Sequence, residues 1–244
     1  MSSTVEVLQP PVVVKISEGR SAERKLDLVS TNARWDPGIF AHEQIRGLVQ
    51  RVFFPGWPRP AGQVVFSGID QTAGVGAVCV RVAQYLAAQV PGHVCLVEAN
   101  LRSSVLRELL GDCSGDDIAS ANDSEWVRSG ANATRGNLRF IPAENFVPDK
   151  KLMFSPAWLG GRLSELGRQY EYAVIHAPPV GLYREATLLG SLCDGVILVL
   201  QAHSTRRIAA RNVKEMLQTA NARLLGTVLN ERTFPIPERL YRKL

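Results

Sequence analysis

One stretch, residues 63–100, constrains the fold more than any other part of the chain. Residues 63–67 form a short apolar run with β-branched side chains, which is typical of a buried parallel strand. Apolar side chains then recur at helical spacing through residues 77–90, and a second apolar run ends at Glu98. Two parallel strands joined by a helix are the repeating unit of α/β sheets, so this stretch predicts the first such unit.

The turn between this strand and helix, Gly74-Val75-Gly76, has the layout of a phosphate-binding loop without its chemistry. In such loops backbone N–H groups surround a phosphate, a lysine contacts the outer phosphates, and a Ser or Thr hydroxyl binds magnesium. Here the lysine position is Ala77 and the hydroxyl position is Val78. We interpret the turn as a tight connection with close strand–helix packing, and the alternative is a backbone site that attracts an anion weakly.

The rest of the chain alternates strand and helix patterns, which predicts an α/β fold with a doubly wound, mostly parallel sheet and helices on both faces. The further predicted strands cover residues 138–142, 172–177, 195–201 and 224–229. The further predicted helices cover residues 39–54, 103–110, 156–170 and 185–192. A last helix can be capped by Ser204 or Thr205, and its apolar face comprises Ala209, Val213, Met216, Leu217 and Ala220.

Length and composition fit one core. The chain has 244 residues, of which 45% are hydrophobic, and this suffices to cover both faces of a single sheet. We interpret residues 36–244 as one α/β domain and residues 1–35, which lack a clear period, as a partly ordered N-terminal arm. No apolar run reaches the length of a membrane span and the N-terminus lacks a signal-peptide pattern, so a cytoplasmic protein is expected.

The formal net charge of +5 is spread over the chain rather than gathered in one block. An ordinary solvated surface explains this scatter better than a nucleic-acid partner does, so no nucleic acid is expected. The alternative for Arg206, Arg207, Arg211 and residues 239–243 is a position near an anionic membrane surface. The four cysteines and four histidines show no metal-ligand spacing, so no metal site is expected.

Polar side chains follow the predicted strands at their carboxyl ends, where ligands bind in open parallel sheets. Glu98, Asn100 and Arg102 follow the second strand, and His176 ends a later one. The first three can cap the following helix, or they can be the remainder of an acid pair, with Glu98 still able to contact a metal. His176 is interpreted as a hydrogen-bonded histidine rather than a base, since the sequence names no partner carboxylate.

Several collinear segments resemble the bacterial tyrosine kinases (BY-kinases) of exopolysaccharide and capsule assembly, a P-loop family related to the MinD and ParA ATPases. The matching segments run from about Glu43 almost to the C-terminus and include EQIRGLVQRVFF, LVEANLR, FIPA, YEYAVIHAPPV, CDGVILVLQAHSTRR and LLGTVLN. The resemblance implies the P-loop fold of a protein tyrosine kinase and a setting in polysaccharide biosynthesis or export.

The chain departs from this family at the positions that carry its chemistry, the Walker motifs. The resemblance implies a lysine at Ala77, a hydroxyl at Val78, a second aspartate at Asn100 and a metal-anchoring aspartate at His176. Losing one group that stabilises phosphoryl transfer costs about 100-fold to 1000-fold in rate, so losing all of them is predicted to abolish catalysis. The chain is therefore expected to be a pseudokinase with no catalytic residue.

What remains of the nucleotide site is interpreted as vestigial. It comprises the loop of residues 74–78 together with Glu98 and Arg102, and it is expected to hold no cofactor. Asp70 lies near the loop in sequence and would oppose an anion there. The alternative is a divergent tyrosine autokinase or ATPase, which would bind ATP and magnesium through Glu98 and backbone groups.

The resemblance also bears on partners. Members of the family assemble into a ring through an ExxRxxR motif, which begins here as Glu43 and Arg46 but has Val49 at its third position. Their tyrosine-rich tail is reduced here to Tyr241 after Tyr183. We expect a scaffold or regulatory module, which forms a homo-oligomer or binds an inner-membrane co-polymerase, a chain-length protein or a related kinase. Such a partner would hold the chain at the periphery of the inner membrane.

A dinucleotide-binding enzyme of the NAD type is a further alternative. Gly74 and Gly76 follow a strand and precede a helix, and Glu98 ends the next strand 22 residues after Gly76 (98 − 76). In that layout the acid holds a ribose. The third glycine position is Cys79, which such a site tolerates only if the helix lies farther from the strand.

Overall fold

The computed structural model describes residues 37–54, 60–110 and 136–231, and all of them lie within one compact unit that covers residues 35–244. The predictions for the N-terminal arm, for the polar region at residues 111–135 and for Tyr241 lie outside the described residues. The described elements are α1 (Pro37–Phe53), β1 (Gln63–Gly68), α2 (Val75–Gln89), β2 (Val94–Glu98), α3 (Val105–Leu110), β3 (Leu138–Ile141), α5 (Ala143–Phe146), the 3-10 helix η2 (Lys150–Phe154), α6 (Pro156–Gln169), β4 (Tyr172–His176), α7 (Glu185–Leu192), β5 (Gly195–Gln201), α8 (Arg207–Thr219) and β6 (Leu224–Asn230).

The six strands form one sheet in the order β3-β2-β4-β1-β5-β6, and every strand pair is parallel. The central strand β1 pairs with β4 through Val65 and Ile175, and with β5 through Val65 and Val196. The prediction of a doubly wound, mostly parallel sheet is confirmed. Because the chain leaves β1 toward β2 and leaves β4 toward β5, the carboxyl ends of β1 and β4 form the switch point where ligands bind in such sheets.

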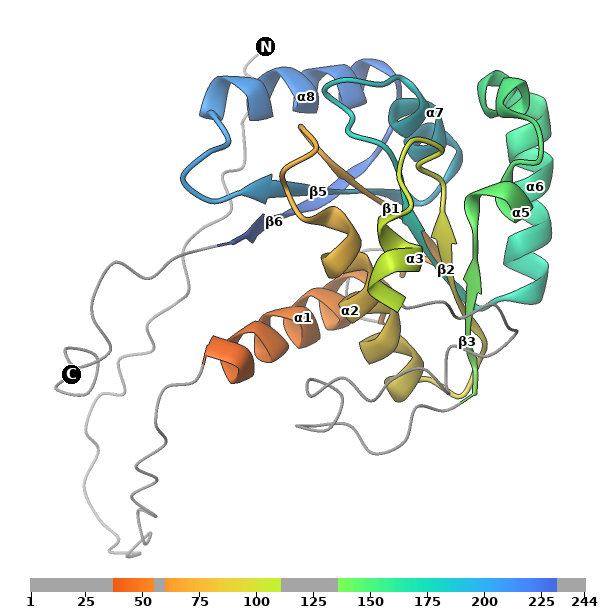
Figure 1. The fold of residues 1–244 in the computed structure, drawn as a ribbon, viewed down its shortest axis with the longest axis horizontal. Coiled ribbons are helices and arrows are strands. Elements are labelled where there is room, and N and C mark those ends of the chain that lie inside the picture. Colours follow the sequence, from red (N-terminus) through yellow and green to blue (C-terminus); the bar gives the residue numbers. More distant parts are fainter. Residues whose placement is uncertain (1–36, 55–59, 111–135, 232–244) are drawn as a thin grey trace, which may run out of the picture. The chain divides into compact units, whose positions relative to one another are not determined.

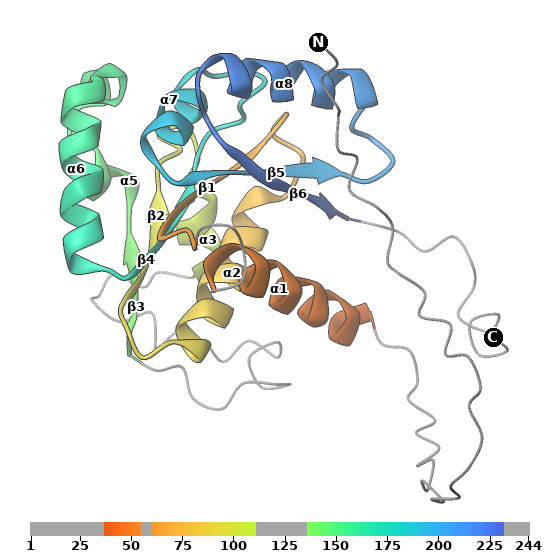
Figure 2. The same ribbon diagram turned by 180° about the vertical axis from the view of Figure 1, so that it is seen from behind.

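Helices cover both faces of the sheet (Figure 1). Successive strand residues point to opposite faces, so Val64 and Phe66 pack in the core beneath α1, α2 and α3, whereas Val65 packs in the core beneath α6, α7 and α8. The view from behind shows α6, α7 and α8 on the face away from α1 (Figure 2). Both layers are filled mainly by aliphatic side chains, which explains why the strands read as continuous apolar runs.

The polar side chains expected at helix N-termini cap one helix, α6, and not another, α8. Ser155 caps α6, as expected from its place before a proline: its hydroxyl accepts a hydrogen bond from Trp158 N at 3.4 Å. The prediction that Ser204 or Thr205 caps α8 is wrong, because Arg206 occupies the cap position without a side-chain bond. The Thr205 hydroxyl instead accepts from Gln201 N at 2.9 Å, which closes the turn after β5.

Two short elements, α5 and η2, were not predicted. They contain 4 and 5 residues, too few to show a period in the sequence. α2 begins at Val75, two residues before the predicted start, because Gly74 already takes the cap position. On α8 only Val213 and Leu217 of the predicted apolar face are buried, and Met216 is exposed.

Candidate functional site

The glycine turn lies at the switch point and directly precedes α2. Gly74 has a φ of 63°, a left-handed conformation that favours glycine, and caps α2 without a side-chain bond. Gly76 is required for a different reason: a Cβ atom there would lie 2.8 Å from Val105 Cγ1 in α3. The close packing inferred from the sequence therefore exists, and at Gly76 its partner is helix α3.

The positions that would carry the phosphate chemistry hold apolar side chains. Val78 is 3% exposed and belongs to the core beneath α1 and α2, and Ala77 is half-buried. Neither side chain has a nitrogen or oxygen atom, so neither supplies the ammonium or the hydroxyl of a nucleotide loop. Backbone N–H groups at the start of α2 are the remaining donors.

Acidic side chains lie around the loop. Asp70 Oδ1 accepts hydrogen bonds from the backbone N–H and the hydroxyl of Thr72, at 3.0 and 2.6 Å. The Thr72 hydroxyl also lies 2.8 Å from Gln201 Oε1, and Gln201 Nε2 donates to Glu231 Oε2 at 2.7 Å. Glu231 Oε1 comes within 3.2 Å of the place where a Cβ on Gly74 would stand. Two carboxylates therefore face the loop, of which the sequence suggested only Asp70.

The Gln201–Glu231 network is reinforced by Asn230, whose side-chain amide donates to Ala73 O at 3.0 Å. A Cβ on Gly74 would lie 2.6 Å from the same amide nitrogen. The end of β6 thus packs directly against the loop. The sequence points to Gln201 as a strand-end residue, but it does not point to Asn230 and Glu231, because their relation to the loop depends on β5 and β6 following β1 in the sheet.

Glu98 and His176 form a buried pair. They are 3% and 4% exposed, and His176 Nδ1 lies 2.6 Å from Glu98 Oε1. The two residues are register neighbours at the ends of β2 and β4. His176 is therefore a hydrogen-bonded strand-end histidine, and Glu98 is the carboxylate that the sequence could not name.

Glu98 also connects β2 to the next helix. Its Oε2 accepts from Leu106 N in the first turn of α3, and its Oε1 accepts from Asn100 N, both at 3.3 Å. Asn100 Oδ1 in turn accepts from Arg102 N at 3.2 Å. The helix-capping interpretation of this cluster thus has a structural basis in Glu98, whose two carboxylate oxygens are both engaged.

Arg102 is engaged by an acid that the sequence did not single out. Its Nη2 lies 2.6 Å from Oε1 of Glu185, a buried residue at the start of α7. The guanidinium also lies over the ring of Tyr183, 4.1 Å from the centroid, which is a cation–π geometry. Arg102 therefore links the β2–α3 connection to the start of α7 through an ion pair.

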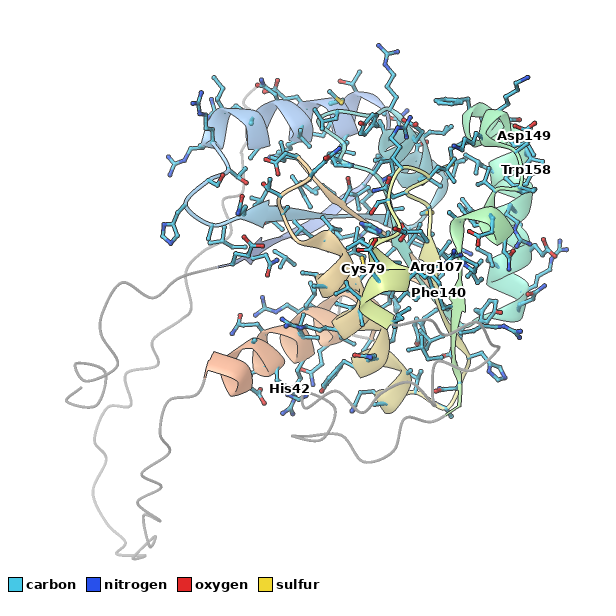
Figure 3. All side chains as sticks on the ribbon, in the orientation of Figure 1. His42, Cys79, Arg107, Phe140, Asp149 and Trp158 are labelled. Atoms are coloured by element: carbon cyan, nitrogen blue, oxygen red, sulfur yellow. The ribbon has the colours of Figure 1, made fainter. Side chains whose placement is uncertain are left out.

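A cavity of about 340 Å³ borders Glu98 and Arg102 and is lined further by Arg107, Phe140 and Glu144, among others. Figure 3 shows Arg107 and Phe140 beside one another at this place. An ion pair joins Arg107 to Glu144, and a backbone hydrogen bond together with Arg107 lowers the pKa of Glu144.

The larger cavity, of about 600 Å³, lies along α5 and α6 and contains none of the predicted site residues. Trp158, Pro148 and Arg162 are among its lining residues, and Figure 3 shows Trp158 on α6. The cavity of about 340 Å³ borders predicted site residues because it opens at the carboxyl end of β2.

The predicted oligomer contact lies on α1. Glu43 and Arg46 are both half-exposed and form an i,i+3 ion pair with an N–O distance of 3.6 Å. Val49, at the third position of the motif, is fully buried in the core. Only the first two positions of the motif therefore face outward.

The geometry also bears on the dinucleotide alternative. Cys79, at the third glycine position, is fully buried, and burial raises the pKa of its thiol. Glu98, which would hold the ribose, is buried and engaged by His176. Both observations speak against an NAD site.

Two further structural findings concern the described ranges alone. Within residues 37–54, 60–110 and 136–231, no three His, Cys, Asp or Glu side chains gather as metal ligands would. In the same ranges, no helix combines the length and the apolar character needed to cross a bilayer.

Sequence relatives of the chain are bacterial tyrosine kinases, although no family model matches it. The tyrosine-protein kinase CpsD of Streptococcus agalactiae is 27% identical over 149 residues, which cover 59% of this chain and 64% of that protein. The tyrosine-protein kinase YwqD of Bacillus subtilis is 22% identical over 200 residues, which cover 81% of this chain and 84% of that protein. The match thus spans less than two thirds of the streptococcal relative's length.

Solved structures share the fold. The chimerical protein CapA2B2 is 19% identical with a TM-score of 0.63, and the match covers 82% of this chain and 92% of that one. The VpsO kinase domain is 20% identical with a TM-score of 0.63, and the match covers 80% and 96%. Together with the sequence relatives, these likenesses confirm the resemblance to the bacterial tyrosine kinases and their P-loop NTPase-like fold.

Proposed function

We propose that this relative of the bacterial tyrosine kinases is a pseudokinase, which retains the kinase fold as a scaffold or regulatory module in exopolysaccharide biosynthesis or export. The observation that carries the proposal is the Glu98–His176 pair. By resemblance, both positions hold acids that manage magnesium in the kinases. Here an imidazole lies 2.6 Å from the remaining carboxylate, at the place where the resemblance implies metal-mediated contacts.

The residues at the loop do not fit ATP and magnesium. Ala77 and Val78 offer no polar atom, and Asp70 and Glu231 add negative charge beside the loop. A phosphate brought there would be repelled by these carboxylates. Magnesium prefers oxygen ligands, and an imidazole is a poor replacement for a carboxylate toward this ion. No phosphoryl-transfer step is therefore assigned to this chain.

Arg102, the remaining cation of the vestigial site, already has partners within the protein. Arg102 is held by Glu185 at 2.6 Å and by the ring of Tyr183. Breaking such a partly buried pair to bind a phosphate would leave the Glu185 carboxylate buried without its partner. Glu98 and Arg102, which would bind nucleotide in a kinase by resemblance, here form internal contacts that stabilise the fold.

The proposed partner follows from the resemblance. It is the cytoplasmic face of an inner-membrane co-polymerase or chain-length protein, or a related kinase with an intact active site. This proposal is supported by the relatives, which are named tyrosine-protein kinases, and by the fold that the chain shares with a solved kinase domain.

Calorimetric titration with ADP and ATP, with and without magnesium, tests the proposal. We expect no heat of binding and no rise in melting temperature at millimolar nucleotide, while an intact bacterial tyrosine kinase measured in parallel shows both. Magnesium-dependent binding that is lost in Glu98→Gln would instead support the divergent autokinase or ATPase. Stabilisation by NAD but not by ATP would support the dinucleotide enzyme.

A further inference from the structure

The outward face of α8 carries a stripe of cations. Arg207, Arg211 and Lys214 follow one another at intervals of four and three residues, so they share one side of the helix, and Arg206 precedes them. All four are exposed, and no described carboxylate forms an ion pair with any of them. Figure 3 shows nitrogen-bearing side chains extending from α8 away from the sheet.

This stripe does not stabilise the helix that carries it. The first turn of α8 contains no acidic residue and its cap makes no side-chain bond, although Arg206 and Arg207 stand at the positive end of the helix dipole. Val213 and Leu217 are buried against the sheet, on an adjoining side of the helix. Glu215 is exposed four residues after Arg211 on the same helix, but the four cations outnumber it. The field that points outward is therefore net positive, and its complement is an external anionic surface.

An exposed apolar side chain lies beside the stripe. Ile208 is 68% exposed and is offset by about 100° around the helix from Arg207. A large aliphatic group next to arginines gains little from the phosphate backbone of a nucleic acid. It gains more at a bilayer interface, where cations contact lipid phosphates while the apolar group enters the boundary with the acyl chains.

We propose that this face of α8, formed by Arg206, Arg207, Ile208, Arg211 and Lys214, binds the surface of an anionic lipid bilayer. The contact is electrostatic and reversible, since the apolar side of α8 is already buried against the sheet. It is independent of any nucleotide or protein partner. It would place the domain at a membrane without a spanning segment.

Vesicle flotation of the full chain tests this inference. The vesicles contain either phosphatidylcholine alone or equal parts of phosphatidylcholine and phosphatidylglycerol. We expect binding to the second kind only, weakened by added salt. Arg207→Gln with Arg211→Gln should bind about 30-fold more weakly, because each cation near an anionic surface contributes about 1 kcal/mol. Ile208→Ser should also bind more weakly while keeping its melting temperature.

The matched control removes two exposed arginines elsewhere, Arg51→Gln with Arg168→Gln, and has the same net charge as the α8 variant. It should bind within about 2-fold of the unaltered chain, since its charges lie outside the stripe. Equal loss in both double variants would overturn the assignment to α8. Equal binding to both vesicles would overturn the lipid proposal, as would binding to random duplex DNA without binding to vesicles.

Discussion

At the scale of the residue, Glu98 determines the character of the site. Its carboxylate is buried and joins His176 on β4 to the backbone N–H groups of Asn100 and Leu106. A buried carboxylate is tolerated only when its oxygens are hydrogen-bonded, and here both are. This carboxylate thus holds β2, β4 and α3 together.

Replacing Glu98 should therefore destabilise the fold. Glu98→Ala leaves His176 and two backbone donors without their acceptor, so we expect the free energy of unfolding to fall by about 3 to 5 kcal/mol. Urea denaturation followed by circular dichroism measures this change. Glu165→Ala is the control, because Glu165 forms an exposed pair with Arg162 that is worth about 1 kcal/mol or less. A loss in Glu98→Ala no larger than in the control would contradict a structural role for the pair.

At the scale of the element, the contact between α2 and α3 closes the glycine loop from one side. Gly76 packs under Val105, whose Cγ1 stands 2.8 Å from the position of an added Cβ. Leu109 Cδ1 is 3.5 Å from the same position. A short helix with apolar side chains thus covers the start of α2, where a nucleotide loop needs space for phosphate.

Gly76→Ala should force α2 and α3 apart. Overpacking of this kind costs about 1 to 3 kcal/mol, so we expect a lower melting temperature in differential scanning calorimetry. Gly160→Ala in α6 is the matched control, because an added Cβ there meets no atom within 4 Å. Within a helix that change should stabilise the chain by about 0.5 to 1 kcal/mol. Equal melting temperatures for the two variants would show that the α2–α3 contact is looser than described.

At the scale of the whole molecule, both cores contain a buried thiol. Cys79 lies in the core under α1, α2 and α3, and Cys95 in the core under α6, α7 and α8. Burial raises the pKa of both thiols, that of Cys95 from 9.0 to about 12. The thiols therefore link the stability of each layer to pH.

Above the ordinary thiol pKa, the free energy of unfolding falls as the pH rises. Unfolded chains lose the Cys95 proton near pH 9.0, whereas the folded chain keeps it to about 12. The folded state then binds more protons, so the contribution of Cys95 to the free energy of unfolding is constant below about pH 9 and falls between there and pH 12. Urea denaturation across this range measures the slope, which should be shallower in Cys95→Ala. A slope unchanged by that substitution would contradict the assignment to Cys95.

The order of strands and helices, and hence the α/β class, could be read from the chain because apolar periodicity is a local property. The apolar side chains of Ala77 and Val78 in the loop could be read in the same way. The wrong cap for α8 shows the limit of local signals. Thr205 has the right chemistry for a cap, but Gln201 N lies within its reach and takes the bond.

The sequence by itself determined the elements, the class of sheet and the apolar side chains at Ala77 and Val78. Only the tertiary structure decided which polar groups meet around the strand ends: Glu98 pairs with His176 across 78 positions, and the Gln201–Glu231 network packs against the loop from β5 and β6. Such partners depend on strand order, which places β2 beside β4 and β5 beside β1. Strand order is set by packing across the whole sheet, and therefore no local pattern records it.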